Sequence, residues 1–250
     1  MFLDSGQVKA SNLEGRSSFL TYFSSPLFRP KHIFIRRKLN WNEAQAYCRQ
    51  HYTELSFFNS QSDIDKLQND TGGSINHGWI GLQRDPNNNT AWMWSGGGYI
   101  TYENWHSGQP SNSRENKGNI RPDGKWNDRI GTNLLHFYCI DVTVEEKMSW
   151  EDALSHCREK QTDLANQLSE AELHLAKVKV KNITQRFWIG LRYLADRWLW
   201  VNGEPLEHES WSQGGDQDHH CPIQKRCGAI HKEGLWENWD CQDKLHFMCI

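Results

Sequence analysis

The chain consists of two related halves, and this internal repeat constrains its fold more than any other feature. Two copies are too few to form a stacked array, so each copy must fold on its own. We predict a first repeat over residues 31–140 and a second repeat over residues 141–250, after an N-terminal extension over residues 1–30 that we expect to be poorly ordered. Six landmarks recur at a constant shift of 109 residues: Trp41, Cys48, Leu55, Ser60, Trp79 and Leu82 match Trp150, Cys157, Leu164, Ser169, Trp188 and Leu191.

Cysteine and aromatic usage indicates an extracellular protein. The 250 residues include 7 cysteines and 13 tryptophans, at a mean hydropathy of −0.81. This composition is typical of small domains in which disulfides staple large aromatic side chains together. Three Asn-x-Thr triplets, which begin at Asn69, Asn88 and Asn182, are candidate N-glycosylation sites and agree with that compartment.

The N-terminal residues do not resemble an export signal, because serines and Pro26 interrupt the apolar patch from Phe19 to Phe28. Either the natural start is missing or mis-assigned, or the protein is not exported. The cysteine usage favours the first alternative. We find no segment that is long and apolar enough to span a bilayer.

Charge and motif content argue against two other classes of function. The formal net charge is −3, and no basic run could neutralise a series of phosphates, so we expect no nucleic-acid partner. The sequence lacks a G-x-S-x-G elbow, a phosphate-binding glycine-rich loop and an H-E-x-x-H helix, so we do not expect an enzyme.

Each repeat is predicted to contain two helices. A polar cap with an acidic residue three positions later marks each helix start. The four starts are Asn40 with Glu43, Ser60 with Asp63, Ser149 with Asp152, and Ser169 with Glu172. In the first helix of each repeat, tryptophan, alanine and cysteine follow at i, i+3 and i+7, which places the cysteine on the buried face.

Short runs rich in aromatic residues follow the helices and are predicted strands. They are 79–82, 92–94 and 137–139 in the first repeat, and 188–191, 198–200 and 247–249 in the second. Long stretches rich in Gly, Pro, Asn and Ser separate the second run from the last, and such loops on a rigid scaffold commonly carry binding sites. We therefore expect an α+β fold, with two helices, a small antiparallel sheet and a long irregular loop region in each repeat.

Together, the W-x6-C helix, the WIGL strand, the long loop, the Trp126-Asn127-Asp128 segment and the final F-x-C resemble the C-type lectin-like domain. The resemblance covers about residues 31–250 and both repeats carry it. Tandem copies with so short a join look like part of a mannose-receptor-like ectodomain or a small soluble lectin. The resemblance implies a receptor-type protein with glycans or glycoproteins as partners.

The resemblance also implies three disulfides. Cys48 would pair with Cys139 and Cys157 with Cys249, each closing a loop of about ninety residues and contributing on the order of 4 kcal/mol. Cys227 would pair with Cys241 and clamp the long loop of the second repeat. Lys117 and Gly131 stand at the matching positions of the first repeat, so we expect its loop to lack the clamp and to be more mobile.

Cys221 remains, in the long loop of the second repeat. One alternative is a thiol outside any disulfide, or one that exchanges locally with Cys227. The other is an interchain disulfide, because related soluble lectins join chains through this loop. His219 and His220 lie beside it, but no second ligand cluster accompanies them, so we do not expect zinc.

The first repeat contains residues that resemble the family's calcium and sugar site. Two neighbouring hydroxyl groups of a sugar can complete the coordination shell of a calcium ion held by oxygen ligands. A cis peptide bond before Pro110 would aim two side-chain oxygens at one ion. The implied calcium ligands are Gln109, Glu115, Asn127 and Asp128, and the implied sugar contacts are Gln109, Ser111, Glu115, Asn127 and Trp105.

Two departures qualify this interpretation. Ser111 stands where sugar-binding relatives have Asn or Asp, which removes an oxygen donor, and Gln109 in place of glutamate favours galactose over mannose. The alternative is that Trp126 and Asn127 serve packing and that Gln109-Pro110-Ser111 forms a simple turn.

In the second repeat the matching segment, residues 214–218, has no proline, and Trp236-Glu237-Asn238 replaces Trp-Asn-Asp. We therefore expect calcium in the first repeat only, with the second repeat as a scaffold or protein contact. The rival hypothesis is a calcium-independent protein-binding or oligomerising module, which Cys221 could link covalently.

Overall fold

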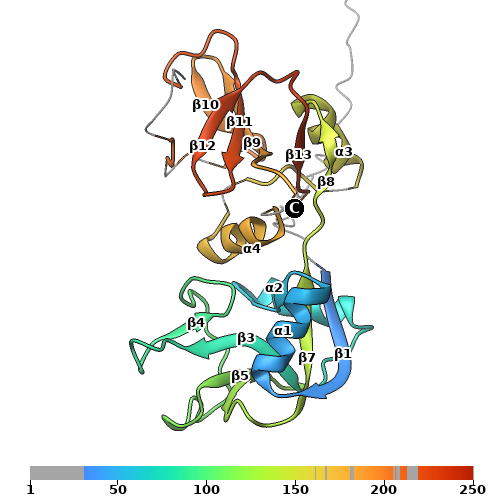
Figure 1. Ribbon diagram of the computed structural model, residues 1–250, viewed down its shortest axis with the longest axis vertical. Helices are drawn as coiled ribbons and strands as arrows, with labels where there is room; N and C mark the ends of the chain where they lie inside the picture. The colour runs from blue at the N-terminus through green and yellow to red at the C-terminus, as the bar shows by residue number, and fades with distance from the viewer. Residues whose placement is uncertain are drawn as a thin grey trace, which may run out of the picture.

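The structure is a computed structural model that describes residues 31–160, 162–166, 168–180, 183–204, 206, 209–212 and 219–249. Three predictions concern residues outside this part: the expected disorder of residues 1–30, the sequon at Asn182, and the segment 214–218. The described residues form two lobes, one for each repeat, stacked along the long axis of the molecule (Figure 1). None of the described helices is long and apolar enough to cross a membrane.

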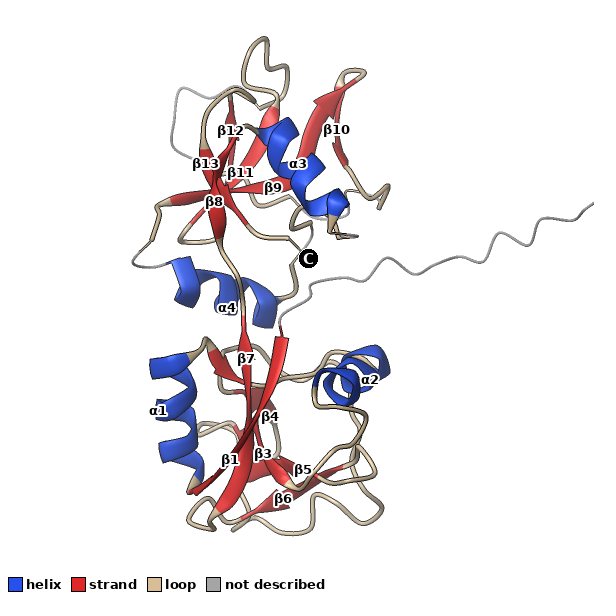
Figure 2. Ribbon diagram, turned by 90° about the vertical axis from the view of Figure 1, so that its right-hand side faces the viewer, coloured by secondary structure: helices blue, strands red, loops and turns tan. Residues whose placement is uncertain are grey.

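The first repeat contains a mixed sheet and two helices. Its strands follow the order β1-β7-β3-β5-β6, with β2 paired to β7 and β4 paired to β3. Helices α1 and α2 lie on either side of this sheet in Figure 2. The elements are β1 (Lys31–Leu39), α1 (Trp41–His51), β2 (Glu54–Leu55), α2 (Gln61–Asp70), β3 (Gly78–Arg84), β4 (Trp92–Trp94), β5 (Lys117–Ile120), β6 (Trp126–Arg129) and β7 (Leu135–Asp141).

The second repeat has the same layout, with strand order β12-β11-β9-β13-β8 and β10 paired to β9. The two repeats together confirm the predicted tandem α+β fold. The elements are β8 (Glu145–Met148), α3 (Trp150–Glu159), α4 (Glu170–Val180), β9 (Arg186–Leu194), β10 (Arg197–Trp200), β11 (Cys227–His231), β12 (Trp236–Trp239) and β13 (Leu245–Phe247).

The sheets differ from the expected small antiparallel sheet in two respects. The stretch that was expected to be irregular contains β5 and β6 in the first repeat, and β11 and β12 in the second. Strands β3 and β7 pair in parallel, and so do β9 and β13. The chain between each of these pairs runs through the long loop and further strands, which is enough length for a crossover between parallel neighbours. The other strand pairs described in both sheets are antiparallel.

The predicted helix starts are confirmed. The Asn40 side chain accepts a hydrogen bond from the Glu43 backbone nitrogen at 2.9 Å, and the Glu43 carboxylate accepts one from the Asn40 nitrogen at 3.1 Å. Ser169 and Glu172 exchange the same two bonds, at 3.3 and 2.7 Å. Each bond satisfies a backbone N–H that a helix start leaves without an intrahelical partner.

Disulfides and buried tryptophans join each first helix to its sheet. The structure contains the bonds Cys48–Cys139, Cys157–Cys249 and Cys227–Cys241. The indole nitrogen of Trp41 donates to a carbonyl of β3 at 2.9 Å, and that of Trp150 donates to the matching carbonyl of β9 at 2.9 Å. The repeat in the sequence is therefore a repeat of contacts in the core.

Helix α4 lies between the two lobes in both ribbon views (Figures 1 and 2). Ser169, which precedes α4, accepts a hydrogen bond from the Asn59 amide at 3.1 Å, and Lys179 of α4 pairs with Asp141 at 2.8 Å. A Cβ atom at Gly97 would lie 2.9 Å from the ring of His174. Close packing therefore accompanies the polar contacts where α4 meets the first repeat.

Candidate functional site

The candidate site lies in the long loop of the first repeat, between β4 and β5. The peptide bond between Gln109 and Pro110 is cis. The backbone nitrogen of Gln109 donates to the His106 carbonyl at 2.9 Å, which fixes the start of the turn. The side-chain oxygen of Gln109 is buried and has no hydrogen-bond partner. A buried acceptor without a donor is costly, so this position favours a cation or a ligand hydroxyl group.

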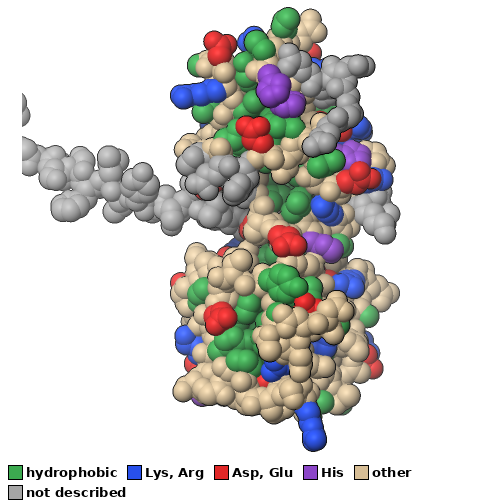
Figure 3. Space-filling view, turned by 90° about the vertical axis from the view of Figure 1, so that its left-hand side faces the viewer, with side chains coloured by type: hydrophobic (Ala, Val, Ile, Leu, Met, Phe, Trp, Pro, Cys, Tyr) green, Lys and Arg blue, Asp and Glu red, His purple; other side chains and the backbone are tan. Residues whose placement is uncertain are grey.

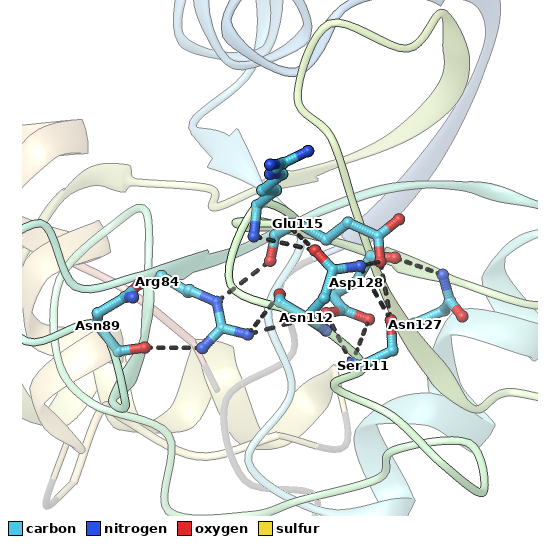
Figure 4. A network of polar contacts seen from close by, with 8 residues as sticks. Arg84, Asn89, Ser111, Asn112, Glu115, Asn127 and Asp128 are labelled. Carbon is cyan, nitrogen blue, oxygen red and sulfur yellow. Dashed lines mark hydrogen bonds and ion pairs between the residues drawn. The ribbon is translucent and has the colours of Figure 1, made fainter.

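Two carboxylates meet this loop. Asp128 of β6 is fully buried, and both its oxygens accept from the backbone nitrogen of Ser111, at 3.1 and 2.9 Å. The Glu115 carboxylate accepts from the Ser111 hydroxyl at 2.8 Å and from the Asn112 amide at 2.7 Å. Figure 4 shows these side chains turned toward one another. The structure thus brings Ser111, Glu115 and Asp128 together.

Asn127 lies beside Asp128 on β6. Its amide nitrogen donates to the Asp128 carbonyl at 2.6 Å and approaches the Asn119 side-chain oxygen at 3.5 Å. Because the nitrogen serves these backbone and side-chain acceptors, the amide oxygen remains available as an acceptor or a ligand.

These residues fit a calcium ion. Calcium prefers oxygen ligands, and the site offers the Gln109 and Asn127 amide oxygens together with the Glu115 and Asp128 carboxylates. The buried, unpartnered Gln109 oxygen is the observation that most requires a positive partner. The two carboxylates would balance the charge of the ion.

Arg84 is a residue of this site that the sequence analysis missed. From the end of β3 its guanidinium donates to the carbonyls of Glu115, Asn89 and Asn112, at 3.1, 2.7 and 3.0 Å. One of its nitrogens lies 3.8 Å from the Asp128 carboxylate. A single arginine after the WIGL strand carries no sequence signal of which loop it faces, so only the structure reveals this contact.

Asn112 was missed as well, although a signal existed. It directly follows Ser111, the position where an amide is absent, and its side chain binds Glu115 and accepts from the Arg114 backbone nitrogen at 2.9 Å. An amide displaced by one residue along the loop therefore reaches the Glu115 carboxylate.

Trp105 is half-buried and belongs largely to the core. Its ring packs edge-on against Trp92 at 4.8 Å and against Trp126 at 5.8 Å. Aromatic pairs in this geometry stabilise the fold beyond their buried area. Any contact of Trp105 with a ligand would involve only its remaining exposed edge.

The second repeat uses the matching positions differently. The Arg186 guanidinium contacts the Glu237 carboxylate, which also accepts from the Trp239 indole at 2.9 Å. Burial alone would raise the pKa of Glu237, but these two partners lower it below its usual range. The Asn238 amide donates to the Lys225 carbonyl at 3.2 Å. The acid at this position therefore already has a cationic partner within the protein.

Neutral and charged donors both hold the described part of the second long loop, where the Arg226 guanidinium donates to the Pro222 carbonyl at 3.1 Å. The Trp198 indole donates to the His219 carbonyl at 2.7 Å, and the Tyr193 hydroxyl donates to the His220 carbonyl at 3.3 Å. The His219 ring stacks on Trp211 at 4.7 Å. Cys221 follows this segment, is exposed, and takes part in none of the three disulfides.

Two sequon asparagines lie on the surface. Asn69 is exposed near the end of α2, and Asn88 is exposed in the turn between β3 and β4. The Thr90 hydroxyl donates to the Asn88 side chain at 2.8 Å. Both asparagines are sterically accessible to a glycosyl group.

A family model described as "Lectin C-type domain" matches residues 37–140 and again residues 146–250. The human C-type mannose receptor 2 is 22% identical over 94% of this chain, which spans 19% of that receptor. The human C-type lectin domain family 10 member A is 31% identical over 42% of this chain and 35% of its own length. Among solved structures, a mouse scavenger receptor C-type lectin carbohydrate-recognition domain is 27% identical, covers 44% of this chain and 88% of its own, and has a TM-score of 0.40.

Proposed function

Because this chain belongs to the C-type lectin domain family, we propose that its first repeat binds glycans or glycoproteins with the help of one calcium ion. The main observation that supports a calcium site is the buried side-chain oxygen of Gln109, which has no hydrogen-bond partner and lies beside the cis bond to Pro110. The proposal places the protein outside the cell and makes it a recognition protein, not an enzyme. Relatives named as lectins and receptors support this class of function.

In the proposed site Gln109, Glu115, Asn127 and Asp128 hold the ion. When bound, calcium would accept two neighbouring hydroxyl groups of a sugar into its coordination shell. Gln109, Glu115 and Asn127 would also hydrogen-bond these hydroxyl groups and so fix the orientation of the sugar. Ser111 would contribute its hydroxyl, and the exposed edge of Trp105 would contact the apolar face of the ring.

Gln109 supports a preference for galactose over mannose, by its resemblance to galactose-binding members of the family. The second repeat would serve as a scaffold or a protein contact, because Arg186 engages Glu237 at the position of Asn127. Asn69, Asn88 and Asn182 would carry N-linked glycans in the extracellular compartment.

The test is binding of the whole chain to immobilised galactose and mannose, with calcium and with a chelator. We expect retention on galactose in calcium, release by the chelator, and loss of binding in Glu115→Gln. Glu237→Gln is the matched control, because it changes the same type of charge at the second repeat and should bind like wild type. Retention that survives the chelator would contradict the proposal.

One observation favours a second candidate, a calcium-independent protein-binding or oligomerising module. Arg84 already places a positive charge 3.8 Å from Asp128, so the loop does not require an external ion for its charge balance. In this case an exposed Cys221 could join two chains. Cys221→Ser would then abolish a covalent dimer on a non-reducing gel, and an unchanged band pattern would eliminate that link.

A further inference from the structure

We infer that Arg84 is a built-in cation that holds the long loop of the first repeat in its folded position when no calcium is bound. The inference concerns the site of the proposed function, but its test measures the order of the loop and not glycan binding. It gives the site a calcium-free state in which the ligands are already arranged.

The first argument is the geometry of the donors. Arg84 reaches the carbonyls of Asn112 and Glu115 in the long loop, and that of Asn89 in the turn between β3 and β4. Its own backbone nitrogen donates to the Asn116 carbonyl at 3.0 Å. A guanidinium is planar and has five N–H groups, so one side chain can join several carbonyl groups. Figure 4 shows Arg84 between these two segments.

The second argument is charge. The Asp128 side chain is 0% exposed and that of Arg84 is 12% exposed. A buried carboxylate is costly unless it has hydrogen bonds and a counter-charge, and Arg84 and the Ser111 nitrogen provide both. Trp92 supports the guanidinium from one face, 4.7 Å from its ring centre. Calcium binds carbonyl and carboxylate oxygens, the same kinds of group that Arg84 engages.

The third argument is that this loop has no disulfide clamp. Lys117 and Gly131 occupy the positions of Cys227 and Cys241. We expected a more mobile loop from that difference alone. The hydrogen bonds of Arg84 constrain this loop even though it lacks a disulfide.

The experiment is limited trypsin digestion of the whole chain in chelator and in calcium, with cleavage after Arg114 followed by mass. Arg114 is exposed within the loop, but cleavage requires the local backbone to open. Arg84→Met keeps the aliphatic stem over Trp92 and removes every side-chain donor. Arg121→Met is the matched control, because Arg121 lies after β5 and its side chain pairs with Asp123 at 3.5 Å.

We expect the wild type to resist cleavage after Arg114 equally with and without calcium. In chelator, Arg84→Met should be cleaved there about tenfold faster or more, since hydrogen bonds from a charged donor are lost. Arg121→Met should match the wild type. Equal protection of Arg84→Met and wild type in chelator would overturn the inference, and so would a wild type that calcium alone protects.

Amide hydrogen exchange separates local opening from unfolding. In Arg84→Met the Ser111 amide should exchange faster while the amides of β7 keep their protection. Faster exchange throughout β7 would instead mean that the whole repeat is destabilised, and it would overturn the assignment to the loop. Should Arg84→Met fail to fold, Arg84→Lys replaces it, with a smaller increase in Arg114 cleavage expected because lysine cannot reach three carbonyls in one plane. Loss of glycan binding in wild type would contradict the proposed function and leave these rates unchanged.

Discussion

In the first repeat Lys117 lies at the start of β5, where the second repeat has Cys227 at the start of β11. The Lys117 ammonium sits 3.8 Å from the centre of the Trp41 ring and donates to the Gln83 side chain at 2.9 Å. In the second repeat the ring of the matching tryptophan, Trp150, is covered by Arg192, at 5.1 Å. Arg192 stands at the position of Gln83. Both repeats therefore place a cation on the helix tryptophan, but from different strands.

The same contrast applies to the two long loops. Arg84 holds the first loop through a charged group, whereas Tyr193, at the matching position, donates from a neutral hydroxyl. A positively charged guanidinium can compete with, or substitute for, a metal ion, whereas a neutral hydroxyl cannot. In the second loop the charged donor, Arg226, bonds the Pro222 carbonyl from within the same loop, so the repeats differ in where the charged donor lies.

The described charged side chains on one face of the molecule show no comparable pattern. On the face drawn in Figure 3, basic and acidic side chains are scattered among one another over both lobes. An extended phosphate backbone would require a continuous basic surface. The described residues on that face form no such continuous basic surface.

Removing the disulfide that only the second repeat has should have the largest effect. Cys227–Cys241 closes 14 residues, so Cys227→Ser with Cys241→Ser should lower the free energy of unfolding of that repeat by about 3 kcal/mol. Hydrogen exchange of β11 measures it, with β5 as the internal control. In the converse variant, Lys117→Cys with Gly131→Cys, a disulfide should form and β5 should become more protected. Equal loss of protection in β5 and β11 would show that the two repeats do not unfold separately.

Substitution of two matching glycines tests the close core packing that both repeats share. A Cβ atom at Gly118 would lie 2.5 Å from Leu82, and one at Gly228 would lie 2.7 Å from Leu191. Gly118→Ala and Gly228→Ala should therefore each destabilise their own repeat by about 1–3 kcal/mol, as overpacking of a core does. Chemical denaturation of the two single variants gives the comparison. Exposed Gly108, with nothing within 4 Å of its Cβ position, is an unsuitable control because its φ of +80° would add backbone strain, so Ser113→Ala replaces it.

Much of the shared architecture could be predicted from the sequence, because it depends on spacing. The i, i+3, i+7 pattern of Trp41, Ala44 and Cys48 directly specifies a buried helix face. The outer strands β1 and β8 were not predicted, and neither were β5, β6, β11 and β12, which lie in stretches predicted to be irregular. Runs such as Lys31–Leu39 lack a clear apolar alternation and depend on pairing with a distant strand. The contacts of Arg84 depend on where two loops meet, and no local pattern encodes that position.

Lowering the pH should destabilise the first repeat more than the second, because the first repeat contains a buried histidine. His32 of β1 is 2% exposed and its ring lies 3.0 Å from the Ser56 hydroxyl. Burial, with the nearby Lys66 second, lowers the pKa of His32 from 6.5 to about 3. Between these values the unfolded chain binds more protons than the folded chain. The free energy of unfolding should therefore fall as the pH drops below 6.5, by up to about 1.4 kcal/mol per pH unit.

His32→Gln should remove this slope, since glutamine keeps a polar group beside Ser56 but does not titrate. The measurement is hydrogen exchange of β7 and of β9 at pH 7.5, 6.5 and 5.5, as separate reports on the two repeats. The described part of the second repeat buries no histidine, so β9 should show a smaller change. The same slope in wild type and His32→Gln would exclude His32 as the cause.

Lys117→Met should have the smallest effect at neutral pH, less than about 1 kcal/mol. The variant loses a cation–π contact, which contributes about 0.5–2 kcal/mol, and the hydrogen bond to Gln83. It also avoids the burial of a charge, which lowers the pKa of Lys117 to about 8. Above that value the folded lysine is neutral while the unfolded one stays protonated up to about pH 10.5. Wild type should therefore gain stability relative to the variant as the pH rises from 8 to 10.

Paired denaturation curves at pH 7 and pH 9.5 measure this difference, and Gln83→Met, which removes only the hydrogen-bond partner, is the control. A variant that is several kcal/mol less stable at pH 7 would mean that the contact with Trp41 outweighs the burial of the ammonium. Lys117 would then replace the disulfide of the second repeat as a true clamp. A near-neutral result would instead leave Arg84 as the main constraint on the first loop, because the other residue at the clamp position, Gly131, has no side chain.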